Sequence, residues 1–582
     1  MVSSVKAKNR FIFRTLLPVF LIYAWLTNLR ETDSYYSVYV LCALAGILAV
    51  MDNAVRGTRV SGRNRVWTAV SAALFSLSVV LANYPLFEPI TALLSLTNAG
   101  LTLLGGFVLC WNVLSCLAEK LPVYRSAENC PTHPGRVFLW VFLAVVLVDS
   151  VFLFFAQYPG VISVDSVSSI RQVMEHDYDN VMPFWHTVSF GALFRLGYLL
   201  FHDYTAAVAF FHFMQILFMA ACFGFAVMTL YEARVPKGWI LAAALLYVFS
   251  YYNIIYSVTL WKDVPFGGAV LLFVAALYRL IRHVGKHRWV NYAVMIAGAM
   301  GLSLLRTNGW YAFLVTALIM LLALRGRERK LITAMLTVLV LCWVLLNPVL
   351  SLLDANEMSY VETLAVPFQQ VARVIANGRS LTQEEEALLS RAFSLEKVKE
   401  VYTPETVDPV KFEAFRYGNL PELKEHLPDY LRLYVRLGLR YPGDYFRAWV
   451  EETKGYWNSG YEFWVYNDYV LDNEYGIAAG SNQNIVSSGF HALFRYQEKL
   501  AILQPLFSVG LCNWIIIACC VLNIVKRREE FALSVPVIVL AAGLWVGTPA
   551  CTTFRYAYPM ILTMPVILLV TIFDAGTADH QQ

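Results

Sequence analysis

Apolar segments of roughly 20 residues recur along almost the whole chain, and a helix needs about that length to cross the hydrocarbon core of a bilayer. Backbone polar groups in lipid must be satisfied internally, which only helices and closed barrels achieve. Of the 582 residues, 58% are hydrophobic and only 15% are charged, whereas about 25% of the residues of a soluble domain are charged. The pattern predicts an all-α polytopic membrane protein.

Basic residues gather in a subset of the connections between these segments. They are dense at 278–289, 325–330 and 525–530, and after the second and fourth apolar segments. Because connections rich in lysine and arginine stay in the cytoplasm, we expect about 14 transmembrane helices, a multi-pass protein of the plasma membrane and cytoplasmic termini. Three apolar segments, 187–201, 204–231 and 238–257, lie between two connections that we expect on the outer face, and only an even number of crossings can join them. The shortest of the three is 187–201. We expect it to be in-plane or re-entrant, or to merge with 204–231 into one bent helix.

The charge balance divides the chain into parts. Residues 354–500 contain 22 acidic and 15 basic side chains, a net charge of −7, and the rest of the chain carries +11. This asymmetry places the acidic stretch outside and does not suggest a nucleic-acid partner. We therefore expect an N-terminal four-helix transmembrane extension (1–136), a transmembrane core with a first outer loop at 158–186 (137–353), a mostly helical extracytoplasmic domain (354–502), and C-terminal transmembrane helices with a short cytoplasmic tail (503–582).

Local patterns predict helices within the outer domain. Thr382 and Glu385 have the spacing of a capping box, and 428–457 has the pattern of two amphipathic helices separated at Tyr441. The aromatic-rich stretch 455–470 has two open interpretations. It is either a belt at the membrane boundary or a platform on which a sugar or lipid stacks.

Two carboxylates stand at the outer ends of predicted spans. Asp165 follows the fifth span, and Asp263 begins a later one. A carboxylate at this depth is costly unless it is solvated, paired or bound to a cation. The outer connections contribute four further candidates: His186, Lys262, Arg306 and Arg555.

Each candidate also has a plain structural interpretation. Asp165 would cap a helix that begins at Ser166, and Asp263 would cap a helix that Pro265 starts. His186 would be a hydrated histidine at the membrane interface, and the two arginines would pair with lipid headgroups. The set favours function more strongly than any single member does.

Familiar catalytic motifs are missing. The sequence contains no GxSxG, no HExxH and no Walker A motif, so it offers no basis for an ATPase or a zinc hydrolase. What remains is acid–base or metal-assisted chemistry, with arginines binding phosphate through bidentate hydrogen bonds.

Six short motifs carry a resemblance to a known superfamily. They are "YPGVISVDS", "PFWHT", "LWKDVPF", "LLRTNG", "VPFQQVARV" and "FRYAYP", which lie between residues 158 and 559. The resemblance covers roughly residues 137 to 573. Together they resemble the GT-C membrane glycosyltransferases, and most closely a family of uncharacterised GT-C-like membrane proteins of Gram-positive bacteria. The first four spans lie outside the resemblance.

The resemblance implies a GT-C-like core and inverting sugar transfer on the outer face of the bacterial cell envelope. The donor would be a polyprenyl-phosphate-linked sugar, and the acceptor a glycan, lipid or protein. Asp165 would be the catalytic base and Asp263 the second acid, and both would be ligands of a divalent cation, Mg²⁺ or Mn²⁺. The substrate-binding residues would be Lys262, His186, Arg306, Gln369, Gln370, Arg373, Arg555 and Tyr556.

One departure from the superfamily bears on the metal. The oligosaccharyltransferases carry a paired DxD-type motif in the second outer loop, whereas this chain has a single acid, Asp263, next to Lys262. The lysine could neutralise phosphate in place of the metal. Two other classes of function stay open, a flippase or transporter of lipid-linked glycans and a non-catalytic envelope assembly subunit.

Overall fold

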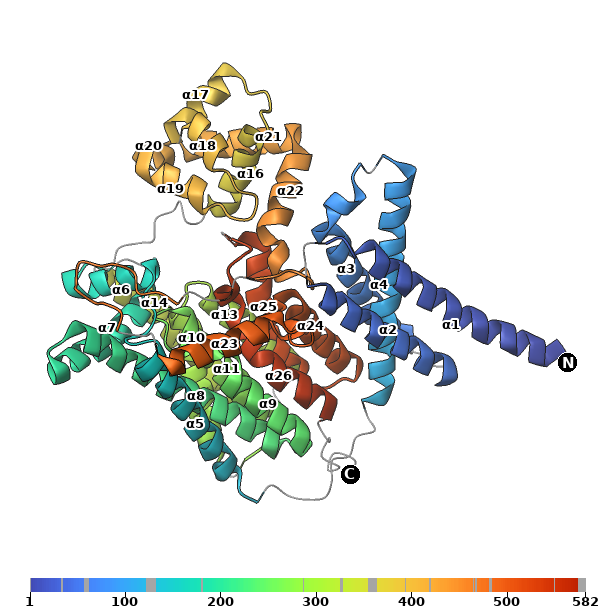
Figure 1. Cartoon of the computed structure of the whole chain (residues 1–582), viewed down its shortest axis with the longest axis horizontal. Coiled ribbons are helices and arrows are strands. Elements are labelled where there is room, and N and C mark those ends of the chain that lie inside the picture. The colour runs from blue at the N-terminus through green and yellow to red at the C-terminus, as the bar shows by residue number, and fades with distance from the viewer. Residues whose placement is uncertain are drawn as a thin grey trace.

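The computed structural model of the chain is built from α-helices (Figure 1). It describes residues 2–573 apart from 33–34, 57–61, 90, 122–131, 179–181, 286, 325–327, 354–363, 393, 418–419, 464, 466–467, 481–483 and 549. Within these residues the only extended pairings are isolated bridges. The prediction of an all-α fold is confirmed for the described part of the chain.

Eight helical stretches among the described residues are long and apolar enough to cross a membrane, and nine if the bent pair α9 (Lys237–Phe249) and α10 (Tyr251–Ser257) forms one span. The architecture is therefore that of a polytopic helical membrane protein, and a count of about 14 spans stays a prediction. The eight are Tyr36–Arg56 (α2), Arg65–Ala82 (in α3), Leu93–Lys120 (α4), Pro134–Ala156 (α5 and η2), Tyr204–Glu232 (α8), Asp263–Ile281 (α11), Arg329–Leu352 (α14 and α15) and Phe554–Phe573 (η6 and α26). Shorter apolar helices are α13 (Gly309–Leu324), α24 (Val509–Val525) and α25 (Phe531–Gly547).

The apolar segment 187–201 forms a separate helix, α7 (Phe184–Phe201), which is not among the candidate spans. It ends at His202 in the left-handed conformation (φ 53°), and Asp203 then caps α8 by accepting a hydrogen bond from the Ala206 N–H (2.7 Å). Two helix ends therefore separate α7 from α8. The alternative of one merged, bent helix is wrong.

The N-terminal helices form a separate bundle, at the right of Figure 1. Helices α1 (Val2–Asn28) to α4 pack around a common core that includes Trp25 and Tyr39. The bundle is attached to the C-terminal helices through the edge-to-face contact of Phe75 with Trp514, whose ring centroids lie 5.6 Å apart. It is also attached through the Tyr39 hydroxyl, which donates to Asn458 Oδ1 (2.9 Å).

The basic connections gather at one end of the helices. Arg282 pairs with Glu530 (3.0 Å), and Arg288 pairs with Glu328 (2.8 Å). These two pairs join the connections that follow α11, α13 and α24. Three of the connections that the charge pattern predicts to be cytoplasmic therefore lie together.

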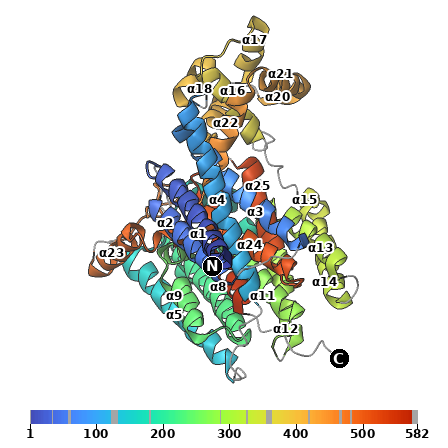
Figure 2. The same cartoon turned by 90° about the vertical axis from the view of Figure 1, so that its right-hand side faces the viewer.

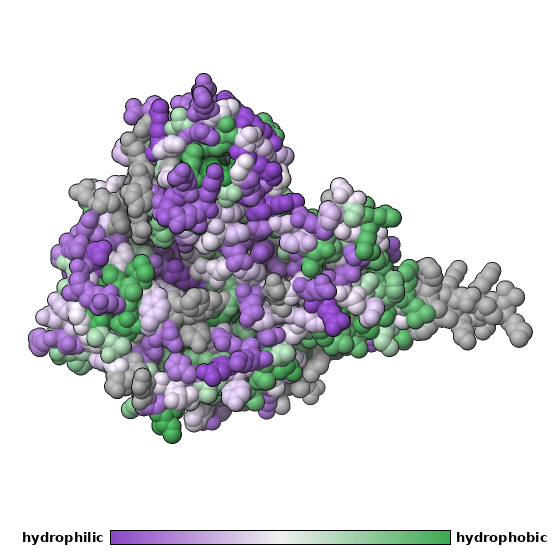
Figure 3. Space-filling view, turned by 45° about the horizontal axis from the view of Figure 1, so that its top comes forward, coloured by the Kyte–Doolittle hydropathy of each residue, from purple (hydrophilic) through white to green (hydrophobic). Residues whose placement is uncertain are grey.

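A helical domain with its own apolar core comprises α16 (Ala365–Ala376) to α22 (Pro442–Thr453). It stands apart from the apolar helices in both views (Figures 1 and 2), and its surface is rich in hydrophilic residues (Figure 3). Between these two helices lie α17 (Gln383–Ala392), α18 (Leu395–Val401), α19 (Asp408–Tyr417), α20 (Leu420–Glu425) and α21 (Leu427–Arg440).

Two local predictions for this domain are confirmed. Thr382 and Glu385 exchange capping-box hydrogen bonds, since each backbone N–H donates to the other's side chain (3.0 and 3.3 Å). The predicted amphipathic helices are α21 and α22, separated at Tyr441.

The aromatic stretch that follows α22 does not act as one surface. Tyr456 is fully buried in the main core, where its hydroxyl donates to the carbonyls of Ala550 and Thr553 (2.9 Å each). Tyr469 lies farther along and lines a cavity described below. Of the described residues of this stretch, Tyr456 therefore belongs to the core, whereas Val465 and Tyr469 line a cavity.

The topology can be tested with one residue at each end. Leu439 on α21 is 81% exposed, and Trp289 at the start of α12 (Arg288–Leu304) is 71% exposed. We expect Leu439→Cys to react with a membrane-impermeant maleimide in intact cells and Trp289→Cys to react only after permeabilisation. The described native cysteines are buried or half-buried, and the wild-type protein gives the background labelling. The reverse pattern would invert the predicted orientation.

Candidate active site

Three chain segments meet below the helical domain and build the floor of the site. The Val161 N–H donates to the Val258 carbonyl (2.7 Å), and the Ile162 N–H donates to the Tyr469 carbonyl (3.2 Å). Gly160 makes this approach possible, because it has φ +120° and a Cβ there would lie 2.1 Å from the His212 ring. These pairings bring the end of the fifth predicted span next to the segment that precedes Asp263.

Asp165 lies in the first turn of α6 (Val164–Glu175). The residue at the cap position is Ser163, whose N–H donates to Ser166 Oγ (3.0 Å) and whose Oγ accepts from Trp261 Nε1 (2.7 Å). The interpretation of Asp165 as the cap of a helix beginning at Ser166 is therefore wrong. Because serine caps the helix, the Asp165 carboxylate is available for other partners.

Asp263 is the first residue of α11 and is completely buried. Its Oδ1 lies 2.5 Å from Nη1 of Arg306, which comes from the break between α12 and α13. The helix begins two residues before Pro265, so the interpretation of Asp263 as its cap is wrong. The buried carboxylate is instead one half of an ion pair.

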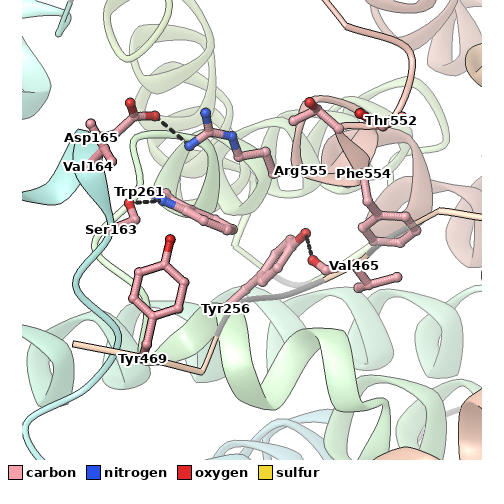
Figure 4. Close-up of a pocket in the computed structure, with 11 residues that line it drawn as sticks. Ser163, Val164, Asp165, Tyr256, Trp261, Val465, Tyr469, Thr552, Phe554 and Arg555 are labelled. Atoms are coloured by element: carbon pink, nitrogen blue, oxygen red, sulfur yellow. Dashed lines mark hydrogen bonds and ion pairs between the residues drawn. The ribbon is translucent and has the colours of Figure 1, made fainter. Parts of the chain in front are cut away.

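Arg555 lies between the two acids, and Figure 4 shows its ion pair with Asp165. Its Nη1 lies 2.5 Å from Asp165 Oδ2, and its Nε lies 3.9 Å from Asp263 Oδ2. The Arg555 guanidinium also lies 4.8 Å from the centroid of the Trp261 ring, within the range of a cation–π interaction. Arg306 lies equally close to the ring of Tyr556 (4.8 Å). Both arginines are therefore held by ion pairs as well as by aromatic rings.

Lys262 and His186 complete the charged cluster. Lys262 lies beside Met182, with Nζ 3.8 Å from the sulfur. Burial lowers the pKa of Lys262, and Asp165 and Asp263 oppose that effect. His186, in the first turn of α7, is only 3% exposed, and neither ring nitrogen has a hydrogen-bond partner among the described residues. The hydrated interfacial interpretation of His186 is wrong.

The cluster sets the protonation of two residues at neutral pH. Burial, with a contribution from the Lys262 charge, lowers the pKa of His186 to about 4, so its ring is neutral. Burial by itself would raise the pKa of Asp165, but Arg555 and Lys262 hold that pKa below its usual value. Asp165 is therefore an ionised carboxylate, with 30% of its side chain exposed.

A cavity of about 300 Å³ opens beside this cluster (Figure 4). The ion pair of Asp165 with Arg555 uses the carboxylate oxygen Oδ2, and 30% of the Asp165 side chain is exposed. The residues that line the cavity include Ser163, Asp165, Tyr256, Trp261, Tyr469 and Arg555. The aromatic rings form apolar walls, and the acid and the arginine provide opposite charges on one side.

The predicted outer-domain residues do not lie in this cluster. Gln369 donates to the carbonyls of Thr403 and Pro404 (2.7 and 3.0 Å). Gln370 donates to the Tyr445 carbonyl (3.1 Å), and Arg373 pairs with Glu451 (2.6 Å). All three residues make contacts within the helical domain, and none of them is among the described residues that line the cavity.

Gln369 is nevertheless connected to the site. The segment that it holds continues to Glu405 and Thr406, which pair with Cys551 and Ala550. The bond from the Cys551 N–H to the Glu405 carbonyl is 2.9 Å long, and Arg555 follows four residues later. The helical domain therefore contacts the segment that contains Arg555 and helps to hold it in place.

Several lining residues were missed by the sequence reasoning. Ser163 and Trp261 lie inside the motifs quoted for Asp165 and Asp263, but their side chains gave no signal of chemistry by themselves. Tyr256 and Tyr469 are two among 33 tyrosines. Ser163 and Trp261 could have been identified because they lie next to Asp165 and Asp263 in the sequence. No local pattern distinguishes Tyr256 and Tyr469 from the other tyrosines.

The residues present do not fit the predicted divalent cation. Among the described residues no group of three or more His, Cys, Asp or Glu side chains could hold a metal ion. Both candidate ligands, Asp165 and Asp263, are already paired with arginines, and Arg555 stands between them. Mg²⁺ and Mn²⁺ prefer several oxygen ligands, so we derive no step through a metal.

The ion pair with Arg555 predicts a pH dependence. A carboxylate with a lowered pKa stays ionised until the pH falls below its usual value of about 3.9, so the acid limb of activity should lie below pH 4. In Arg555→Gln, burial is no longer opposed by this charge, so the pKa of Asp165 rises and the limb moves to higher pH. A pH–rate profile of both proteins measures this shift. An unmoved limb would mean that Asp165 does not control it.

The fold and the site define a class, namely helical membrane proteins with a charged cavity at the base of a polar helical domain. The chain belongs to the family described as "Family of unknown function (DUF6020)", whose model matches residues 139–582. No curated protein and no solved structure matched the chain. The matched region contains the whole charged cluster and excludes α1 to α4.

Proposed function

We propose that this protein is an integral membrane glycosyltransferase, which moves a sugar from a polyprenyl-phosphate donor to a cell-envelope acceptor on the outer face of the membrane. The observation that carries the proposal is the position of Asp165. Its ionised carboxylate borders a cavity and pairs with Arg555 through Oδ2. A partly exposed base beside buried cations suits the transfer of a sugar away from phosphate.

The acid supports the role of general base. In an inverting transfer, the acceptor hydroxyl oxygen forms a bond to the anomeric carbon while the bond from that carbon to the phosphate oxygen breaks. The hydroxyl proton passes to Asp165 Oδ1, while Arg555 keeps Oδ2 in place (2.5 Å). A positioned base of this kind contributes about 10²–10⁴-fold to a rate.

The cations support the role of phosphate binding. Arg555, Arg306 and Lys262 carry three positive charges against the two carboxylates Asp165 and Asp263, so the cluster has a net charge of +1 with His186 neutral. An arginine stabilises phosphate oxygens through parallel N–H bonds. The departing polyprenyl phosphate would leave its negative charge beside Arg555.

The experiment that tests the proposal begins with a deletion strain. Loss of the transferase should cause its glycolipid donor to accumulate, and the mass of that lipid would identify the sugar. Purified protein with that lipid and envelope acceptors should then release polyprenyl phosphate. A deletion strain with an unchanged glycolipid profile would contradict the proposal.

Chelation separates this chemistry from metal-assisted transfer. Because Asp165 and Asp263 are both paired with arginines, we expect transfer activity to survive exhaustive treatment with EDTA. Activity is measured before chelation, after chelation and after addition of excess Mg²⁺ or Mn²⁺. Loss of activity that either metal restores would show that a divalent cation binds in a way the described residues do not indicate.

One observation favours a transporter of lipid-linked glycans as the second candidate. Helices α9 and α10 meet at a bend of 47°, and every residue of α10 is buried. Interrupted helices often line the binding sites of transporters. A transporter would move the glycolipid across vesicle membranes without releasing polyprenyl phosphate, whereas a glycosyltransferase would release it.

A further inference from the structure

A second cavity lies where the N-terminal bundle meets the helical domain. It has a volume of about 680 Å³, within the range of about 300–1,000 Å³ that is typical of ligand pockets. One wall comes from the end of α3, the start of α4 and the connection between them, which includes the short helix η1 (Tyr84–Phe87). The other wall comes from α22. Among the described residues, this cavity shares no lining residue with the charged cavity. It is therefore separate from the site of the proposed transfer.

The position of this groove indicates which molecules can reach it. Leu81 lies in the last turn of the candidate span Arg65–Ala82, and Ala99 lies in the second turn of Leu93–Lys120. Leu93 and Leu94, at the start of that second span, are 81% and 72% exposed. Large apolar side chains exposed at the end of a membrane span face lipid, so the groove opens at the level of the lipid headgroups.

The lining has two chemically different parts. Leu81, Phe87, Ala99 and Phe446 supply apolar walls. The polar part is the ion pair between Arg447 and Glu88 (2.5 Å), in which the side chains are 46% and 41% exposed. The Arg447 guanidinium also lies 5.4 Å from the centre of the Tyr84 ring. An apolar channel with an accessible arginine at its rim matches a molecule with a hydrocarbon chain and an anionic phosphate.

We infer that this groove binds a phospholipid of the bilayer, with an acyl chain against Leu81, Phe87 and Phe446 and the phosphate on Arg447. The lipid lies between helices that the family model excludes, α3 and α4, and helix α22, which it includes. It therefore joins the N-terminal extension to the family's helical domain. This inference does not rest on the proposed glycosyl transfer.

The ion pair gives substitutions with opposite expected effects. Glu88 competes with the phosphate for the Arg447 guanidinium, so Glu88→Gln frees the cation and should tighten lipid binding severalfold. Arg447→Gln removes the phosphate partner and should weaken binding about tenfold, as expected for loss of one charge-assisted hydrogen bond. If the pair served only to hold the two parts of the protein together, the two substitutions would act in the same direction.

The experiment uses the full-length protein in detergent, with palmitoyl-oleoyl phosphatidylglycerol as the probe and native mass spectrometry to measure the bound lipid. Arg432→Gln is the matched control, because Arg432 is an exposed arginine (77%) on another helix of the same domain and should not change binding. Ala99→Trp fills the groove and should abolish retention while the protein still elutes as a monodisperse peak. Thermal unfolding provides a second readout, because a lipid that binds the folded state raises the midpoint.

Three results would overturn the inference. Equal binding by the wild type, Arg447→Gln and Ala99→Trp would mean that the groove is not the site. Weaker binding by both Glu88→Gln and Arg447→Gln would show that the ion pair has only a structural role. Preferential retention of polyprenyl phosphate over phosphatidylglycerol would replace a bilayer lipid with a substrate-like lipid.

Discussion

Asp165→Asn should reduce glycosyl transfer by about 10²–10⁴-fold, the usual contribution of a general base. The asparagine has nearly the same shape but cannot take the acceptor proton. It also removes the negative charge that pairs with Arg555 (2.5 Å). Because Asp165 is 30% exposed and does not cap α6, the variant should fold and reach the membrane in normal amounts.

The measurement compares release of polyprenyl phosphate by purified wild type and variant, together with glycolipid accumulation in the deletion strain that carries each gene. Glu175→Gln is the matched control, since Glu175 is an exposed acid at the other end of the same helix. We expect Glu175→Gln to retain full activity. Full activity of a well-folded Asp165→Asn protein would remove the general base from the proposal and would favour a non-catalytic assembly subunit.

Asp263→Leu should destabilise the protein strongly. Asp263 is fully buried, and its partner Arg306 has only 15% of its side chain exposed. Removing one member of a buried ion pair leaves the other charge without compensation, at a cost of about 3–5 kcal/mol. We expect a large fall in the midpoint of thermal unfolding in detergent and a reduced yield of monodisperse protein.

A second substitution separates stability from function. Asp263→Leu combined with Arg306→Leu replaces the pair with apolar side chains, which often restores the stability of a buried site. The double variant should regain most of the lost stability but should remain inactive, since it lacks a cation of the proposed phosphate site. If the double variant were no more stable than Asp263→Leu, the buried charge of Arg306 would not be the cause of the instability.

An exposed ion pair serves as the control for this comparison. Arg171 and Glu474 lie 3.3 Å apart, and more than half of each side chain is exposed. Pairs of this kind contribute about 1 kcal/mol or less. Glu474→Gln should therefore leave the unfolding midpoint almost unchanged. A loss as large as that of Asp263→Leu would show that burial does not distinguish the two pairs.

Interactions between residues within one helical turn could be predicted from the sequence. Thr382 and Glu385 lie three residues apart, so one helical turn is enough to bring their side chains to each other's backbone. The same reasoning was wrong for Asp165, because Ser163 and Asp165 are both good capping residues. A tertiary contact distinguishes the two residues: Ser163 is the cap, and its hydroxyl accepts a hydrogen bond from Trp261 Nε1.

The resemblance implied that Gln369, Gln370 and Arg373 bind substrate, but the structure places them away from the cavity. Gln369 lies in a motif of the implied family, and its amide holds the carbonyls of Thr403 and Pro404. No local property of a glutamine distinguishes a substrate ligand from a residue that holds a neighbouring loop. Only the path of the chain, through Glu405 to Cys551, relates this glutamine to Arg555.

The sequence by itself determined the helical architecture, because hydrophobic length is a sum over neighbouring residues, and its charge balance predicts a polar domain. It also identified Asp165 and Asp263, since a carboxylate at the end of an apolar segment is conspicuous wherever the chain folds. Only the tertiary structure decided that Arg555 stands between them and that Arg306 neutralises the buried acid. These contacts join residues that are 43 to 390 positions apart. Their distances depend on how the helices pack, which no local pattern encodes.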